Sequence, residues 1–156
     1  MASIAYRPLR AGERTPVLEV FAGLSERSRR LRFLGSKPRL LESDLAHLVN
    51  VGCCGREAVA AIDQESGRTV GIARFVRDEG APEAEIAFEV VDSWQGRGVG
   101  SRLVAALLDV AAEEGITRLH ATVAPENRAA LALMRRLGRI EWTSFVDGAY
   151  EVVVAL

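Results

Sequence analysis

The chain has 156 residues, of which 49% are hydrophobic and 26% charged, and its formal net charge is −1. This length suits a domain with a core of its own, so we expect residues 1–156 to form one domain. The near-neutral charge argues against nucleic-acid binding, and no apolar run approaches the ~18 residues of a membrane span. Because the first residues also lack an apolar signal core, we expect a cytoplasmic protein without membrane partners.

The first third of the sequence predicts a strand followed by helices. Weak alternation favours a strand at residues 4–9, and the Thr15-Pro16 pair is typical of the start of a short helix that ends near Phe21. Further helices are expected at 25–33 and at 40–49, the latter with Ser43 or Asp44 as its cap.

From residue 57 the pattern changes to strands. Apolar runs at 58–62, 69–77 and 83–91, separated by glycine-containing turns, predict an antiparallel meander. A helix at 98–114 follows at once, with Leu103, Leu107 and Val110 on one stripe.

The last third predicts a crossover and a hairpin. A strand at 116–123 after the long helix should lie parallel to the strand at 83–91, because a strand–helix–strand unit joins parallel neighbours. A helix at 127–137 precedes a hairpin of strands 140–145 and 150–155 around Asp147-Gly148. The order indicates an α/β fold with a mixed sheet.

The stretch with the clearest chemistry is the glycine turn, residues 95–100, with the sequence Gln-Gly-Arg-Gly-Val-Gly. Glycine lets backbone amides approach a ligand closely, and a helix start adds unpaired N–H groups and a partial positive charge. Arg97 and Arg102 add full charges, so the turn is suited to a phosphate or pyrophosphate. A turn that merely reverses the chain is the alternative.

Two common nucleotide motifs fit this turn poorly. A Rossmann fingerprint requires a third glycine where Ser101 stands, and a P-loop requires a Gly-Lys-Ser/Thr sequence that does not occur here.

The element order and two motifs together resemble the GCN5-related N-acetyltransferases (GNAT) over nearly the whole chain. The motifs are the glycine turn with the strand before it, and Asn127-x-x-Ala130-x-x-Leu133. The resemblance implies a mixed, mostly antiparallel central sheet with helices on both faces, and acetyl-CoA as co-substrate. It implies that the turn holds the cofactor's pyrophosphate, that strand backbone binds the pantetheine arm, and that Asn127 lies near the sulfur end. The implied cofactor-binding residues are Val90, Val91, Gln95, Gly96, Arg97, Gly98, Val99, Gly100, Ser101 and Asn127.

Three further stretches are similar to the acetyltransferase domain of bacterial Pat-type protein lysine acetyltransferases. They are Leu24-Ser25-x-x-Ser28-x-x-x-Arg32-Phe33, Asp44-Leu45-x-x-Leu48 and Ala84-Glu85-Ile86-Ala87-Phe88. This resemblance implies that Glu85 is the general base.

A base is required because an amine of pKa ~10 is almost wholly protonated at neutral pH. Glu85 suits the role if it is partly desolvated, and Glu89, closer to the turn, is the alternative base. The alternative interpretation is that Glu85 has no catalytic role and belongs to a row of exposed carboxylates, since Glu83, Glu85 and Glu89 share one strand face. Many relatives place a tyrosine general acid where this chain has Met134.

The acceptor is expected to be a primary amine on a protein lysine side chain, with a small-molecule amine as the alternative acceptor. A non-catalytic acetyl-CoA-sensing domain is the alternative function. A homodimer is left open. A Cys–His acyl-enzyme built from Cys53 or Cys54 with His47 or His120 is a weaker alternative. Adjacent cysteines lack metal-ligand spacing, so no metal site is expected.

Three arginines on the helix at 127–137 have two possible roles. Arg128, Arg135 and Arg136 can reach the 3′-phosphate of CoA or form a solvated face.

Overall fold

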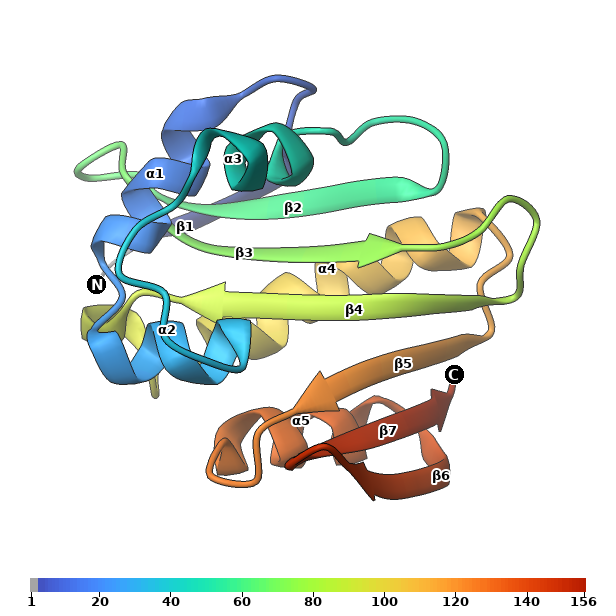
Figure 1. Cartoon of the computed structure of the whole chain (residues 1–156). Helices are drawn as coiled ribbons and strands as arrows, with labels where there is room; N and C mark the ends of the chain where they lie inside the picture. The colour runs from blue at the N-terminus through green and yellow to red at the C-terminus, as the bar shows by residue number, and fades with distance from the viewer. Residues whose placement is uncertain (1–2) are drawn as a thin grey trace.

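The strands of the computed structural model, which describes residues 3–156, form a seven-stranded sheet in the order β1-β2-β3-β4-β5-β7-β6 (Figure 1). They are β1 (Ile4–Pro8), β2 (Arg56–Asp63), β3 (Thr69–Val76), β4 (Glu83–Val90), β5 (Arg118–Val123), β6 (Arg139–Val146) and β7 (Ala149–Ala155). Neighbouring strands are antiparallel except β4 and β5, which are parallel. The predicted meander, parallel crossover pair and final hairpin are therefore confirmed.

Helices cover both faces of this sheet. They are α1 (Arg14–Ala22), α2 (Glu26–Phe33), α3 (Glu42–Leu48), α4 (Val99–Glu113) and α5 (Arg128–Leu137), with a short 3₁₀ helix η1 (Asp92–Trp94). In Figure 1, α1, α2 and α3 lie in front of the sheet and α4 lies behind it. This arrangement confirms the expected mixed, mostly antiparallel α/β fold, whereas η1 was missed because three residues carry no helical periodicity. Within the described residues, no helix is both long and apolar enough to cross a membrane.

The cap of α3 differs from the expectation. Leu41 occupies the N-cap, and Asp44, at the third helical position, accepts a hydrogen bond from the Leu41 N–H at 2.8 Å. Asp44 thus stabilises the helix start from inside the first turn, whereas Ser43 is not the cap. An acceptor at either position can satisfy an amide of the first turn, so sequence alone did not distinguish them.

Close packing of α4 against β3 and β4 fixes where the glycine turn lies. Leu103 and Leu107 of α4 are fully buried, and burial of each stabilises the fold by about 2 kcal/mol. A Cβ at Gly71 of β3 would lie 2.7 Å from Leu103 Cδ1, so this close approach requires glycine. The start of α4 is therefore held directly beyond the end of β4.

Candidate functional site

The glycine turn joins β4 to α4 through η1. Gly96 and Gly98 have φ angles of 75° and 83°, in the left-handed region that strains other residues. Gly98 is the N-cap of α4 and has no side chain that could satisfy the amides of the first turn. Those donors and the positive end of the helix together form an anion-binding site.

The parallel strands β4 and β5 separate before they reach this turn. Their Cα partners run only from Glu83–Arg118 to Glu85–His120, although β4 continues to Val90. Residues 86–90 of β4 keep their antiparallel partners on β3, so one edge of this stretch is not covered by a strand. An extended ligand with amide groups can add to such an edge as a further strand does.

A cavity of about 610 Å³ connects the open edge with the glycine turn. Its walls come from α2, the end of β4, the turn and the start of α5, and its volume is in the range of small-molecule sites. The structure brings together in its lining eight of the predicted cofactor-binding residues, namely Val90, Gln95, Gly96, Gly98, Val99, Gly100, Ser101 and Asn127.

The other two predicted cofactor-binding residues lie outside this lining. Val91 is buried, its N–H donates to the Val70 carbonyl at 2.9 Å, and its carbonyl accepts from Trp94 N–H at 2.9 Å. The Arg97 guanidinium stacks over the Trp94 ring, 4.7 Å from its centroid. Of the two strand residues, Val90 is therefore the one whose backbone faces the cavity.

Helix α2 is tied to the turn by hydrogen bonds. The Gln95 amide donates to Ser28 Oγ at 3.3 Å and to the Val90 carbonyl at 2.9 Å. Asp92 accepts from the Ser25 N–H at 3.0 Å. The serines of the Leu24–Phe33 stretch thus hold the wall of the cavity in place, a role that no local sequence pattern indicates.

A buried ion pair fastens α2 to β4 at the same cavity. Arg32 Nε lies 2.6 Å from Glu89 Oε2, and Arg74 Nη2 lies 3.9 Å from Glu89 Oε1. Arg74 also donates to the Leu48 carbonyl at 2.8 Å. Burial lowers the pKa of the Arg74 guanidinium, and the Glu89 carboxylate opposes this effect. Glu89 is therefore held between two cations, with its side chain only 8% exposed.

Comparison with known proteins identifies this arrangement. The model of the acetyltransferase (GNAT) family matches residues 27–138. The chain belongs to the GNAT family. Members of this family use acetyl-CoA as co-substrate, which confirms the co-substrate and the acetyltransferase class predicted from the sequence.

Individual GNAT relatives are similar over different parts of the chain. The acetyltransferase Pat of Mycolicibacterium smegmatis is 44% identical over 75 residues, which are 47% of this chain and 22% of Pat. An L-2,4-diaminobutyric acid acetyltransferase of Nocardia farcinica is 29% identical over 104 residues, 65% of this chain and 53% of that enzyme. The chain thus spans about a fifth to a half of the length of these relatives.

A solved structure confirms the fold over the entire chain. The crystal structure of the GNAT domain of S. lividans PAT is 27% identical and superposes with a TM-score of 0.87, covering 99% of this chain and 97% of that domain. The resemblance to Pat-type acetyltransferase domains is thereby confirmed.

Glu85 lies at the last β4–β5 pair of the GNAT sheet, opposite His120, where the strands begin to separate. Glu85 is exposed to solvent, so the protein by itself does not provide the partial desolvation expected for a base. Substrates that cover this point would have to supply it.

The position of the usual general acid holds a methionine. Met134 stands where many GNAT relatives have tyrosine, and it is fully buried in the core.

Asn127 has two contacts at the start of α5. Its side chain caps the helix by accepting from the Ala130 N–H at 3.2 Å, and the residue also lines the cavity.

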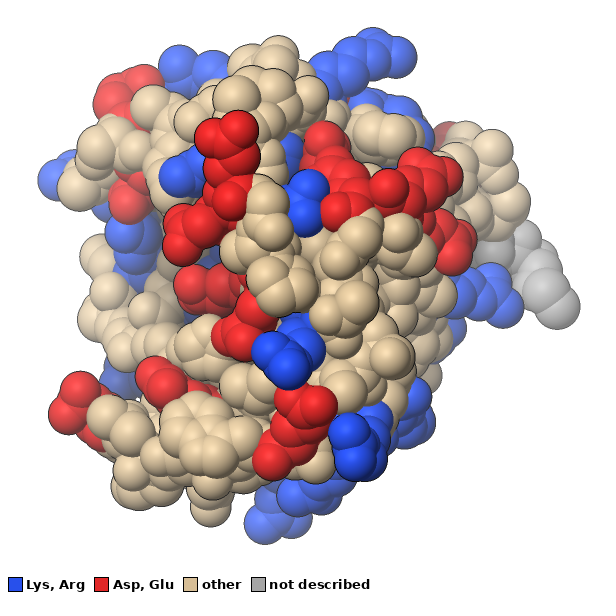
Figure 2. Space-filling model, turned by 90° about the vertical axis from the view of Figure 1, so that its right-hand side faces the viewer, with Lys and Arg blue, Asp and Glu red and all other residues tan. Residues whose placement is uncertain are grey.

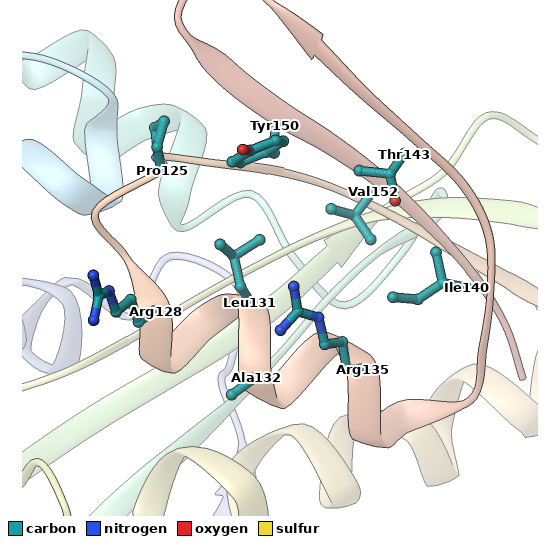
Figure 3. A pocket seen from close by; sticks show the side chains of 9 residues that line it. All are labelled: Pro125, Arg128, Leu131, Ala132, Arg135, Ile140, Thr143, Tyr150 and Val152. Carbon is teal, nitrogen blue, oxygen red and sulfur yellow. The ribbon is translucent and has the colours of Figure 1, made fainter.

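The arginines of α5 divide between two cavities. Arg136 lines the cavity beside the glycine turn and donates to Ser101 Oγ at 3.2 Å, which brings a positive charge to the first turn of α4. Arg135 instead lines a second cavity of about 550 Å³ between α5 and the β6–β7 hairpin (Figure 3). Arg128 lies at the edge of both.

The structure does not assemble a Cys–His site. Cys53 and Cys54 are exposed in the turn before β2, His47 contacts Arg56 at 3.4 Å, and His120 lies across the sheet on β5. Among residues 3–156, no cluster of three or more His, Cys, Asp or Glu side chains could hold a metal ion.

Proposed function

We propose that this GNAT protein transfers an acetyl group from acetyl-CoA directly to a primary amine, with Glu85 as general base, and that the acceptor is a protein lysine side chain. One observation carries the proposal. The anion-binding turn, the open edge of β4 and Glu85 lie along one line, in the order in which a CoA thioester would need them.

The cofactor would follow β4 from the turn toward Glu85. Its pyrophosphate would bind the amides at the start of α4, with Arg136 nearby. Its pantetheine amides would pair with the open edge, beginning at the Val90 carbonyl, where they would replace the Gln95 amide. Val90 and Glu85 are five residues apart, about 16 Å at ~3.3 Å per residue.

The chemistry then requires a proton acceptor and an oxyanion donor. Glu85 would take a proton from the ammonium, and the freed amine would attack the thioester carbonyl. A backbone N–H of the open β4 edge would stabilise the tetrahedral oxyanion. The nitrogen would then give its second proton to water, and water would deliver a proton to the departing CoA sulfur, because the buried Met134 has none to give.

Glu85 is preferred over Glu89 because of what each carboxylate contacts. Glu89 is paired with Arg32 in the interior, and withdrawing its charge would leave Arg32 and the buried Arg74 without compensation. Glu85 is exposed at the vertex, the point where β4 and β5 separate, and is open to an incoming amine. Glu89 is thus better suited to holding α2 than to accepting protons.

The acceptor is assigned from the Pat relatives. Similarity to Pat over 75 residues, and to the PAT domain over 99% of the chain, supports a protein lysine acceptor through the resemblance to Pat-type protein lysine acetyltransferases. The diaminobutyric acid acetyltransferase supports a small-molecule amine as the second candidate.

The test measures CoA thiol release with acetyl-CoA and two acceptor sets, lysine-containing proteins or peptides and free diamino acids, with mass spectrometry of the products. We expect ε-acetyl-lysine in the protein set. Turnover only with free diamines would favour the small-molecule acceptor, and acetyl-CoA binding without turnover on any amine would indicate a sensor.

Glu85→Gln is the first variant to compare. It keeps the shape of the side chain but cannot accept the proton, so we expect acetyl-CoA affinity to be unchanged and kcat at pH 7.5 to fall by about 10²-fold. Calorimetry and steady-state rates between pH 6 and 9 would measure both. An unchanged rate with an unchanged pH profile would contradict the assignment of Glu85.

A further inference from the structure

The vertex where β4 and β5 separate brings a second titratable side chain next to Glu85. Glu85 and His120 are Cα partners in the parallel pair, so their side chains stand on the same face of the sheet, on strands about 4.8 Å apart. Side chains alternate along β4, so Glu85 and Glu89 share one face and Val90 lies on the other. Val90 lies toward Gly100 of α4, whereas Glu89 lies toward Arg32 of α2. Glu85 and His120 therefore stand on the face opposite α4.

His120 has an acidic partner on its other side. Its Nε2 lies 3.7 Å from Oε2 of Glu151 on β7, and both side chains are partly exposed, at 26% and 33%. Glu85, His120 and Glu151 therefore form a row across β4, β5 and β7, beginning at the vertex and ending at solvent.

The charged surroundings of His120 are mostly acidic. On its face stand Glu83 and Glu85 of β4 and Glu151 of β7, while Arg118 of its own strand is engaged by Glu141 Oε2 at 3.0 Å. Figure 2 views the molecule from the end of the sheet where β4 and β5 begin, and acidic side chains gather over the middle of that view. These charges attract a cationic amine to the point where β4 and β5 separate.

We propose that His120, supported by Glu151, is a proton-relay residue that carries the proton from Glu85 to solvent. This inference rests on the proposed function. An N–H bond of the acceptor ammonium breaks, its electron pair stays on nitrogen, and the proton goes to a Glu85 carboxylate oxygen. The proton then passes through a water to the neutral imidazole of His120, and the imidazolium, stabilised by Glu151, gives it to bulk water.

The relay would compensate for the weak basicity of an exposed carboxylate at this site. An exposed carboxylate is a weak base at neutral pH, because a carboxyl in water titrates about two pH units below an imidazole. Imidazole is the side chain best suited to exchanging protons at physiological pH, so one placed beside the carboxylate can regenerate it in each turnover. His120 acts through Glu85 and does not need to touch the thioester.

The experiment compares pH–rate profiles of kcat and kcat/KM between pH 5.5 and 9.5. His120→Gln keeps a polar side chain near Glu151 but does not titrate, so we expect kcat at pH 7.5 to fall about tenfold and the inflection near neutrality to disappear. The KM for acetyl-CoA and the melting temperature should stay unchanged. Glu151→Gln should lower kcat in the same direction as His120→Gln but by less, because it removes the carboxylate that pairs with the imidazole.

A matched control and a chemical rescue distinguish the relay from a structural role. Arg118→Gln changes a charge on the same strand and face, and it should leave the inflection in place. In His120→Ala, added imidazole should restore part of the lost kcat, which a purely structural defect would not allow.

The outcomes separate this inference from the function on which it rests. If His120→Gln keeps the wild-type pH profile while Glu85→Gln is impaired, the relay is wrong and the acetyltransfer mechanism stands. If wild-type protein transfers no acetyl group to any amine, the proposed function is wrong and the relay with it.

Discussion

Glu85 and Glu89 lie four residues apart on the same face of β4, yet their surroundings differ. Glu85 is exposed at the vertex of the two separating strands, whereas Glu89 is buried between Arg32 and Arg74. At the scale of single residues, this difference in partners is what divides a candidate base from a structural carboxylate.

We expect Glu89→Gln to reduce the free energy of unfolding by about 3 kcal/mol, because it leaves the buried Arg74 and the largely buried Arg32 without a counter-charge. Urea unfolding at pH 7 would measure the loss. The matched change at the exposed site, Glu85→Gln, should alter stability by less than about 0.5 kcal/mol. Equal losses in the two variants would show that the Arg32–Glu89 pair does not secure α2.

At the scale of elements, the site depends on how α4 begins. The helix starts at a glycine with positive φ and points its first amides into the cavity lined by α2 and α5. Gly98 has no other atom within 4 Å of an added Cβ, so the space beside it is open. A substitution there therefore tests ligand approach separately from core packing.

Gly98→Ala should weaken acetyl-CoA binding by at least tenfold, because the Cβ would occupy space beside the amides that we propose to hold the pyrophosphate. Gly80→Ala is its control, since Gly80 also has positive φ and open space but lies in the β3–β4 turn. Both should lose about 1 kcal/mol of stability from backbone strain. Titration calorimetry would measure affinity, and equal affinity in the two variants would contradict the pyrophosphate model.

At the scale of the whole molecule, stability is expected to depend on pH through an ion pair between β1 and the start of α1. Arg7 donates to Glu13 Oε1 at 2.9 Å and lowers the pKa of the Glu13 carboxyl to about 2. Because this pKa is lower in the folded state, the pair stabilises the fold above about pH 4.5, and the contribution is lost as the pH falls toward 2.

Arg7→Gln should therefore lower the free energy of unfolding by about 1 kcal/mol at pH 7 and at pH 5, after allowance for solvent screening of a partly exposed pair. At pH 3 the difference from wild type should become smaller. Urea unfolding at the three pH values would measure it, and a difference that grows toward low pH would contradict this linkage.

Much of the fold and of the cofactor site was predictable because the signals are local. Alternation and helical spacing located the strands and helices, and the Asp147-Gly148 turn located the final hairpin. The turn of residues 95–100 and Asn127 indicated a CoA site that the structure gathers around one cavity. The resemblance to GNAT proteins supplied the cofactor and the candidate base.

Other features were out of reach because they join distant segments. No pattern indicates that Arg32 contacts Glu89, that Ser28 contacts Gln95, or that α5 and the β6–β7 hairpin enclose a second cavity. Each contact depends on how the helices lie on the sheet, which backbone propensity does not specify.

The sequence by itself determined the elements, the anion-binding turn and the row of carboxylates on β4, because glycine spacing and periodicity are properties of neighbouring residues. Only the tertiary structure decided which carboxylate is free to act. The β4–β5 pairing ends at Glu85 and His120, and α2 folds over Glu89, so burial and ion pairing give different surroundings to two residues that the sequence presents as equivalent.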